Sequence, residues 1–215
     1  MKEAAKQQYA YSYGLPVPKI IDVTRINGKR AIIMEYIQGD TLGDLLFKDK
    51  EKAEIYLSLS IDIQMKIHNI EPDSQDVESM KDKLARQIKS MHQLDKNQKN
   101  NLIEELDLMT YENRLCHGDF HLFNLIQTSQ QIVIIYWVDA TVGDIHADVF
   151  RTYLLYSQVS TDLAEMYLNL YCEKIEMLKA DVLKWAPILA AARLSESVST
   201  DNTEQLMKTI NRLEK

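Results

Sequence analysis

One short segment, "LCHGDFHLFNLI", gathers side chains that could do chemistry. It places His117, Asp119, His121 and Asn124 within eight residues, between apolar runs that are typical of buried strands. Asp119 and Asn124 are five positions apart, which matches the catalytic loop of protein kinases. In such a loop the aspartate accepts or orients the proton of an attacking hydroxyl, and the asparagine carbonyl binds a magnesium ion held between phosphates. The spacing therefore indicates phosphoryl transfer.

Two other interpretations of the same residues stay open. On an extended strand His117, Asp119 and His121 would point to one side, which would suit a zinc or dimetal hydrolase. Such a site usually needs further histidine ligands, and the remaining histidines follow no ordered pattern. A plain polar turn would instead use Asp119 to bind backbone amides and would pack the histidines in the core.

The composition favours a protein that acts on small molecules. The chain has 215 residues, of which 46% are hydrophobic and 27% charged, as in an ordinary globular protein. The net charge of −7 argues against a nucleic-acid partner, which would need a Lys/Arg-rich face, and would suit a cationic small molecule. No apolar run has the length of a membrane span, and the first residues lack the apolar stretch of a signal peptide. We therefore predict a cytoplasmic protein that binds neither nucleic acid nor membrane.

The order of elements predicts an α+β fold with a minor β part. A helix over residues 2–13 precedes a β-hairpin over 19–37, whose turn is "NG", a strong hairpin signal. In the helix expected over 51–70, four isoleucine and leucine residues fall four apart and predict one apolar face: Ile55, Leu59, Ile63 and Ile67. Short strands are expected in 114–138. The other helices are expected over residues 77–94, 97–109, 144–158, 161–178, 180–197 and 202–213.

The segments "LCHGDFHLFNLI" and "VDATVGDIHADVFRTYLL" together resemble the aminoglycoside phosphotransferase / choline kinase-like family. That family has the motif His-Gly-Asp-x-x-x-x-Asn, then a strand hairpin, Ile-Asp-Trp, and Gly-Asp before a helix. The resemblance covers nearly the whole chain and implies a protein-kinase-like fold. It also implies transfer of a phosphoryl group from ATP to the hydroxyl of a small acceptor such as an aminoglycoside, a sugar or an amino alcohol.

The resemblance divides the chain into two parts. Residues 1–37 would form a partial N-lobe, made of the C-helix and the hairpin. Residues 38–215 would form the hinge and a mostly helical C-lobe, which carries the catalytic-loop segment 115–144 as a small β insert.

The resemblance also implies roles for residues of the C-lobe. Asp119 would be the catalytic base and Asn124 a ligand of Mg2+. His117 would brace the loop. Asp144, which follows Gly143, would cap the next helix and anchor the loop.

In the N-lobe and hinge the implied roles concern ATP. Met34 would lie beside the adenine ring, and the backbone of Glu35, Tyr36 and Ile37 would bind its edge. Glu3 falls at the position of the helix glutamate that pairs with a strand lysine in kinase-like folds.

The chain departs from the family pattern in two places. It reads "IIYWV" where Ile-Asp-Trp is expected, so Tyr136 replaces the second magnesium ligand. A neutral phenol is a poor ligand for a hard cation. Gly14 is the first glycine, so no Gly-rich loop precedes Glu3, and no strand supplies the lysine.

These departures predict an N-terminally truncated N-lobe with weak or absent ATP binding and impaired catalysis. The alternative to a working kinase is then a non-catalytic kinase-like binding module. Its hairpin would leave an exposed strand edge through which two copies would pair.

Overall fold

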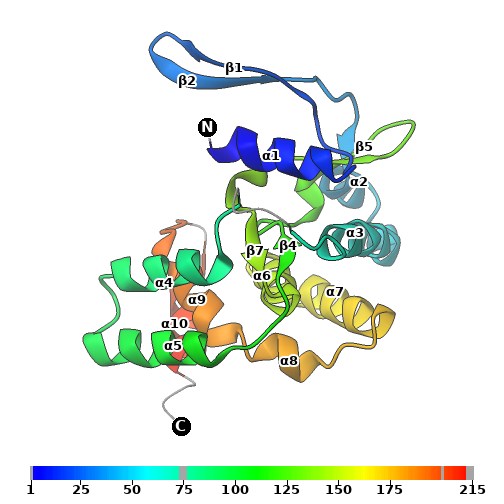
Figure 1. Ribbon diagram of the computed structural model, residues 1–215. Coiled ribbons are helices and arrows are strands. Elements are labelled where there is room, and N and C mark those ends of the chain that lie inside the picture. The colour runs from blue at the N-terminus through cyan, green and yellow to red at the C-terminus, as the bar shows by residue number, and fades with distance from the viewer. Residues whose placement is uncertain (1, 73–76, 200, 212–215) are drawn as a thin grey trace.

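A computed structural model describes residues 2–72, 77–199 and 201–211, and it has the α+β organisation predicted from the sequence (Figure 1). The α-helices are α1 (Lys2–Ser12), α2 (Leu42–Lys48), α3 (Ala53–His68), α4 (Met80–Ser90), α5 (Lys96–Leu108), α6 (Ile145–Ser157), α7 (Thr161–Lys174), α8 (Lys179–Leu183), α9 (Ala186–Ser195) and α10 (Thr203–Ile210). The strands are β1 (Ile20–Ile26), β2 (Lys29–Met34), β3 (Asp40–Thr41), β4 (Arg114–Cys116), β5 (Leu125–Gln127), β6 (Ile132–Ile134) and β7 (Thr141–Gly143). Short 3-10 helices are η1 (Lys50–Lys52), η2 (Leu122–Asn124) and η3 (Trp137–Asp139).

The N-terminal part consists of the β1–β2 hairpin lying over α1, apart from the helical body (Figure 1). Its turn, Asn27 and Gly28, has positive φ at both positions (52° and 77°), as a two-residue hairpin loop requires. Within the described residues the sheet has two strands only, so both outer edges are unpaired. Large apolar side chains are exposed on it, among them Ile21 (67%) and Ile26 (53%).

The body below α1 surrounds α6, which packs against α7, α8 and α9 (Figure 1). Two small antiparallel sheets, β3–β5–β6 and β4–β7, sit beside it and carry the loop with Asp119 between their strands. The two tryptophans, Trp137 and Trp185, are almost fully buried in this core. No helix among the described residues is long and apolar enough to cross a membrane.

The apolar face predicted for the first long helix is only half right. Ile63 and Ile67 are buried in α3, but Ile55 and Leu59 are exposed (55% and 37%). A step of four residues turns more than one full 3.6-residue turn, so a stripe of three such steps drifts around the helix. The inner face of α3 instead includes two polar residues, Gln64 and His68, which bind partners on α6 and α7.

Several predicted boundaries shift. The helix expected over 180–197 is divided into α8 and α9, and Pro187 lies in the first turn of α9, where a proline is tolerated. The helix expected over 161–178 ends at Lys174, and residues 212–213 of the last predicted helix lie outside the described residues. The strand expected up to Val138 ends at Ile134.

Candidate active site

The loop between β4 and β5 brings Asp119 and Asn124 into contact. The side-chain amide nitrogen of Asn124 donates to the backbone carbonyl of Asp119 (2.7 Å) and to its carboxylate oxygen Oδ2 (3.1 Å). Because the amide nitrogen is bound to Asp119, the carbonyl oxygen of Asn124 is the atom left for a cation. The five-residue spacing therefore produces the convergence that the sequence indicated.

The carboxylate of Asp119 is ionised at neutral pH. Burial raises its pKa, but contact with His121 and the charge of Arg151 outweigh burial and hold the pKa at about 2. The Nε2 atom of His121 lies 3.7 Å from Oδ2 of Asp119, whose side chain stays 27% exposed. A carboxylate with so low a pKa is a weak base, so it suits orienting a hydroxyl and receiving its proton late in the reaction.

His117 braces the loop, as the resemblance implied. The ring is fully buried, and its Nδ1 accepts the backbone N–H of Asp119 (3.3 Å). The Nε2 atom therefore carries the proton and donates to the carbonyl of Ile135 (3.1 Å). Burial lowers the pKa of His117, which keeps the ring neutral.

The metal-hydrolase interpretation is wrong. Residues 117–124 form a turn and the η2 helix, not an extended strand, and both nitrogens of His117 are occupied. Within the described part of the chain, the ligand atoms that converge belong to His68, Cys116 and Asp148. Those three side chains are buried, and His68 already binds Asp148 (2.9 Å).

Two residues of α6 bind the backbone of the loop, and neither of them was identified from the sequence. Asp148 accepts the backbone N–H of Gly118 (2.8 Å), and Arg151 donates from Nε to the carbonyl of the same glycine (3.1 Å). Gly118 has φ +79°, and a Cβ there would lie 2.4 Å from the carbonyl oxygen of Asp139. Asp148 and Arg151 follow Asp144 by four and seven positions, so the three share one helix face, but this spacing alone does not show that the face is buried.

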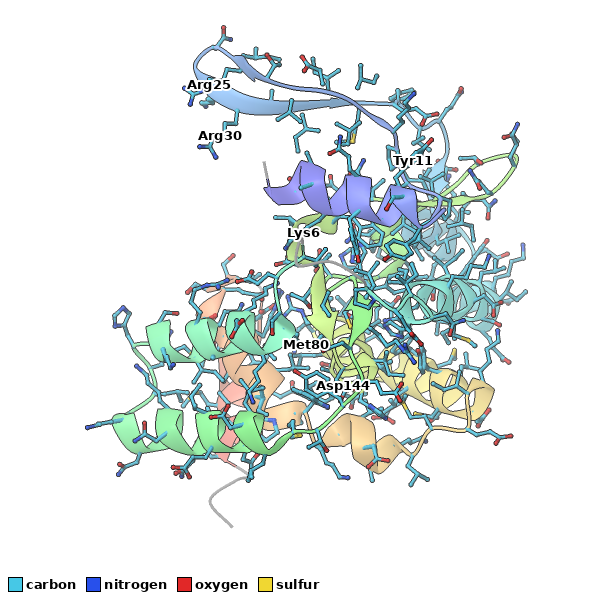
Figure 2. All side chains as sticks on the ribbon, viewed as in Figure 1. Lys6, Tyr11, Arg25, Arg30, Met80 and Asp144 are labelled. Atoms are coloured by element: carbon cyan, nitrogen blue, oxygen red, sulfur yellow. The ribbon has the colours of Figure 1, made fainter. Side chains whose placement is uncertain are left out.

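Asp144 caps α6, as predicted, but it does not anchor the loop. One carboxylate oxygen accepts the backbone N–H of His146 (2.9 Å), and the other accepts the indole N–H of Trp185 (3.0 Å). Figure 2 shows Asp144 inside the body, well below α1. Its bonds tie the start of α6 to α9, and the anchoring of the loop belongs to Asp148.

We expect Asp148→Asn to lower the free energy of unfolding by about 3 kcal/mol, because an amide replaces a buried charge that binds His68 and Gly118. Burial raises the pKa of Asp148, but the hydrogen bonds from His68 and the backbone of Gly118 outweigh it and lower the pKa. Urea denaturation measures the change. Asp107→Asn, at an exposed carboxylate that pairs with Lys81, is the control and should change stability by less than about 0.5 kcal/mol. Equal effects of the two substitutions would contradict this role.

Tyr136 follows directly after the segment that pairs with the loop. The backbone N–H of Ile135 donates to the backbone carbonyl of Asn124 (3.0 Å), so position 136 is one residue along the chain from a contact with Asn124. Tyr136 has left-handed backbone angles (φ 64°, ψ 65°) and is 57% exposed. Asp139 does not replace the missing carboxylate, because it pairs with Lys83 (2.6 Å). Among the residues that the structure describes, the loop offers one amide oxygen beside Asp119 and no second acidic ligand, which does not fit a tightly held Mg2+.

The predicted adenine-binding segment lies at the end of β2. The N–H of Glu35 donates to the carbonyl of Lys19 (2.9 Å), so it is not free for a ligand. Met34 faces α1, with its sulfur 3.9 Å from the amide of Gln7. Tyr36 is 88% exposed, and Tyr36 and Ile37 make no backbone–backbone bond to any described residue.

Two residues of α1 face different surroundings. Glu3 lies in the first turn, half-buried, and forms no ion pair with a described residue. Lys6 is buried and donates from Nζ to the carbonyl of Val138 (2.7 Å), which joins α1 to η3 (Figure 2).

Comparison with known proteins decides the family. The profile of the phosphotransferase enzyme family matches residues 1–186. The chain belongs to this family. No curated protein matches it.

Solved structures show the fold that family members share. A thermostable mutant of aminoglycoside phosphotransferase APH(4)-Ia, as a ternary complex with ADP and hygromycin B, superposes with a TM-score of 0.71 at 16% identity, covering 99% of this chain and 81% of that one. Amicoumacin kinase hAmiN, in complex with AMP-PNP, Ca2+ and Ami, has a TM-score of 0.65 at 12% identity (99% and 76%). A choline/ethanolamine kinase family protein from Mesorhizobium loti has a TM-score of 0.61 at 15% identity (99% and 76%). The protein-kinase-like fold predicted from the sequence is confirmed.

Proposed function

We propose that the protein transfers the γ-phosphoryl group of ATP to a hydroxyl of a small acceptor, with reduced efficiency, in the cytoplasm. The observation that carries the proposal is the contact between Asp119 and Asn124 in a loop held by His117 and Asp148. Membership of the phosphotransferase family supports it. The solved relatives that hold ADP or AMP-PNP support ATP as the donor.

In the proposed reaction the acceptor oxygen forms a bond to the γ-phosphorus of ATP. The bond from that phosphorus to the oxygen it shares with the β-phosphate breaks, and ADP leaves. Asp119 orients the acceptor hydroxyl and takes its proton, so the products are a phosphate monoester, ADP and a proton that Asp119 returns to water. Asn124 fixes the Asp119 carboxylate through its amide nitrogen.

A magnesium ion would supply charge neutralisation on the phosphates in such a reaction. The carbonyl oxygen of Asn124 is the ligand that the chain offers for it, and Tyr136 stands where a second would be needed. For this reason we propose that catalysis is impaired.

We expect Mg-ATP to bind weakly, with a dissociation constant of about 1 mM or higher, because Tyr136 replaces a carboxylate that would bind the metal ion. Isothermal titration calorimetry with Mg-ATP measures it, and ADP release in the presence of acceptor alcohols tests the reaction. A micromolar dissociation constant for Mg-ATP would contradict the proposal that the site is impaired. Affinity without any turnover would favour the second candidate function.

That second candidate is a non-catalytic kinase-like binding module. The position of Tyr136 favours it, and so do the unpaired edges of the β1–β2 sheet, where a second copy would pair. A monomer at high concentration in sedimentation experiments would argue against pairing through this edge.

A further inference from the structure

An apolar cavity of about 750 Å3 lies beside the catalytic loop, between α2, η2, the end of α6 and the start of α7. Its volume is in the range of small-molecule sites, about 300 to 1,000 Å3. Neither the loop chemistry nor the helix packing described above uses this space. The wall is formed largely by Leu46, Phe47, Phe123, Leu155, Val159 and Met166.

Three large apolar residues are exposed at this one cavity. Phe47, Phe123 and Val159 are 64%, 42% and 79% exposed. The rings of Phe47 and Phe123 lie 5.7 Å apart, and α2 approaches Phe123 closely because a Cβ at Gly43 would lie 2.6 Å from that ring. Exposed apolar side chains that gather around one opening mark a ligand site more often than scattered ones do.

The charges that line the cavity cancel. The two positive residues are Lys50 and Arg193, and the two negative ones are Asp162 and Asp201. The chain as a whole, in contrast, has a net charge of −7. Asp201 is already neutralised, because Arg193 donates to its carboxylate (2.9 Å). A polycation needs several unpaired carboxylates, so this lining does not suit one.

His121 connects the cavity with the catalytic carboxylate. Its Nε2 faces Asp119 (3.7 Å), while its Nδ1 is buried and has no hydrogen-bond partner among the described atoms. A buried nitrogen without a partner is unfavourable, and a hydrogen bond from a ligand hydroxyl would remove that penalty. The cavity therefore has a broad apolar body and a polar end that adjoins the site of phosphoryl transfer.

We propose that this cavity binds the acceptor, and that the acceptor is an uncharged alcohol with a broad apolar body rather than a polycationic sugar. The role of the bound alcohol as phosphoryl acceptor rests on the proposed function. Binding of the alcohol in the cavity does not depend on that function. The apolar body packs against Phe47, Phe123 and Val159, and the reacting hydroxyl lies at the His121 end, next to Asp119.

Binding is tested with hydrocortisone as a neutral steroid alcohol and hygromycin B as a polycation, by NMR titration of the full chain without ATP. We expect hydrocortisone to bind saturably, and Phe47→Asp to weaken that binding at least about tenfold, because it places a charge in the apolar wall. Leu178→Asp is the control, since Leu178 is 69% exposed and lies outside this cavity. Hygromycin B should bind more weakly than hydrocortisone.

Each outcome decides a different point. No saturable hydrocortisone binding, or binding that Phe47→Asp leaves unchanged, overturns the inference. Tighter binding of hygromycin B that Phe47→Asp weakens also overturns it, because the cavity would then take a polycation. Phosphoryl transfer to hygromycin B without hydrocortisone binding leaves the proposed function intact and removes this acceptor. If hydrocortisone binds and the binding needs Phe47, but no phosphoryl group passes from ATP to any alcohol, the cavity remains a site for neutral alcohols and the proposed function is overturned.

Discussion

Asp119→Asn should lower the rate of phosphoryl transfer from ATP at least about a thousandfold, because an amide can orient a hydroxyl but cannot take its proton. The substitution keeps the size of the side chain, and an amide oxygen at position 119 can still accept the bond from Asn124. The measurement is the initial rate of ADP formation with and without acceptor alcohol. A control at a half-exposed carboxylate away from the loop, Asp181→Asn, should leave the rate unchanged.

The same substitution has a pH-dependent effect on stability. The folded pKa of Asp119, about 2, lies below the value of about 3.9 expected in the unfolded chain, so the ionised group stabilises the fold above pH 4. That contribution, about 2 kcal/mol, is lost as the pH falls from 4 toward 2. Wild type should therefore be more stable than Asp119→Asn at pH 7, and the difference should vanish near pH 2. Urea denaturation at both pH values measures it.

Two results would contradict the role given to Asp119. An unchanged rate in Asp119→Asn would mean that the ADP-forming reaction does not pass through this carboxylate. A stability difference that persists at pH 2 would mean that the asparagine disturbs the loop by its shape, and the lost rate would then say little about proton transfer.

The sequence predicted the parts of the site that depend on neighbours along the chain. Asp119 and Asn124 are five residues apart in one loop, so their meeting follows from local geometry, and the cap at Asp144 follows from the first turn of a helix. Asp148 was missed because its partners, His68 and Gly118, are brought to it by tertiary packing. A buried acid on a helix face has no local pattern that distinguishes it from a solvated one.

The errors in the fold have the same origin. Ile55 and Leu59 were placed on a buried face by spacing alone, but the polar residues Gln64 and His68 occupy that face because they have partners on neighbouring helices. The strand predicted through Tyr136 ends early because His117 and Asn124 hold both backbone groups of Ile135, and the chain must then turn. Long-range hydrogen bonds of this kind cannot be seen in periodicity.

The second large effect concerns Tyr136→Asp. Aspartate adopts the left-handed conformation at φ 64° more readily than tyrosine does, so the substitution fits the backbone that is already there. It also adds a carboxylate one residue after Ile135, whose N–H binds the backbone carbonyl of Asn124, and a hard cation prefers more than one oxygen ligand. We expect Mg-ATP affinity to rise at least about tenfold and the rate of phosphoryl transfer to rise about a hundredfold.

Tyr136→Asn separates the effect of the added carboxylate from the effect of relieved backbone strain, because asparagine relieves the same strain without adding a charge. It should stabilise the fold by about 1 kcal/mol, as measured by urea denaturation, and leave the magnesium dependence of ATP binding as it is in wild type. If both variants raise ATP affinity equally, backbone strain and not the missing carboxylate limits the site. If neither does, position 136 is not the reason for weak binding, and the surface above the loop, where α1 and the hairpin lie, becomes the part of the molecule that limits catalysis.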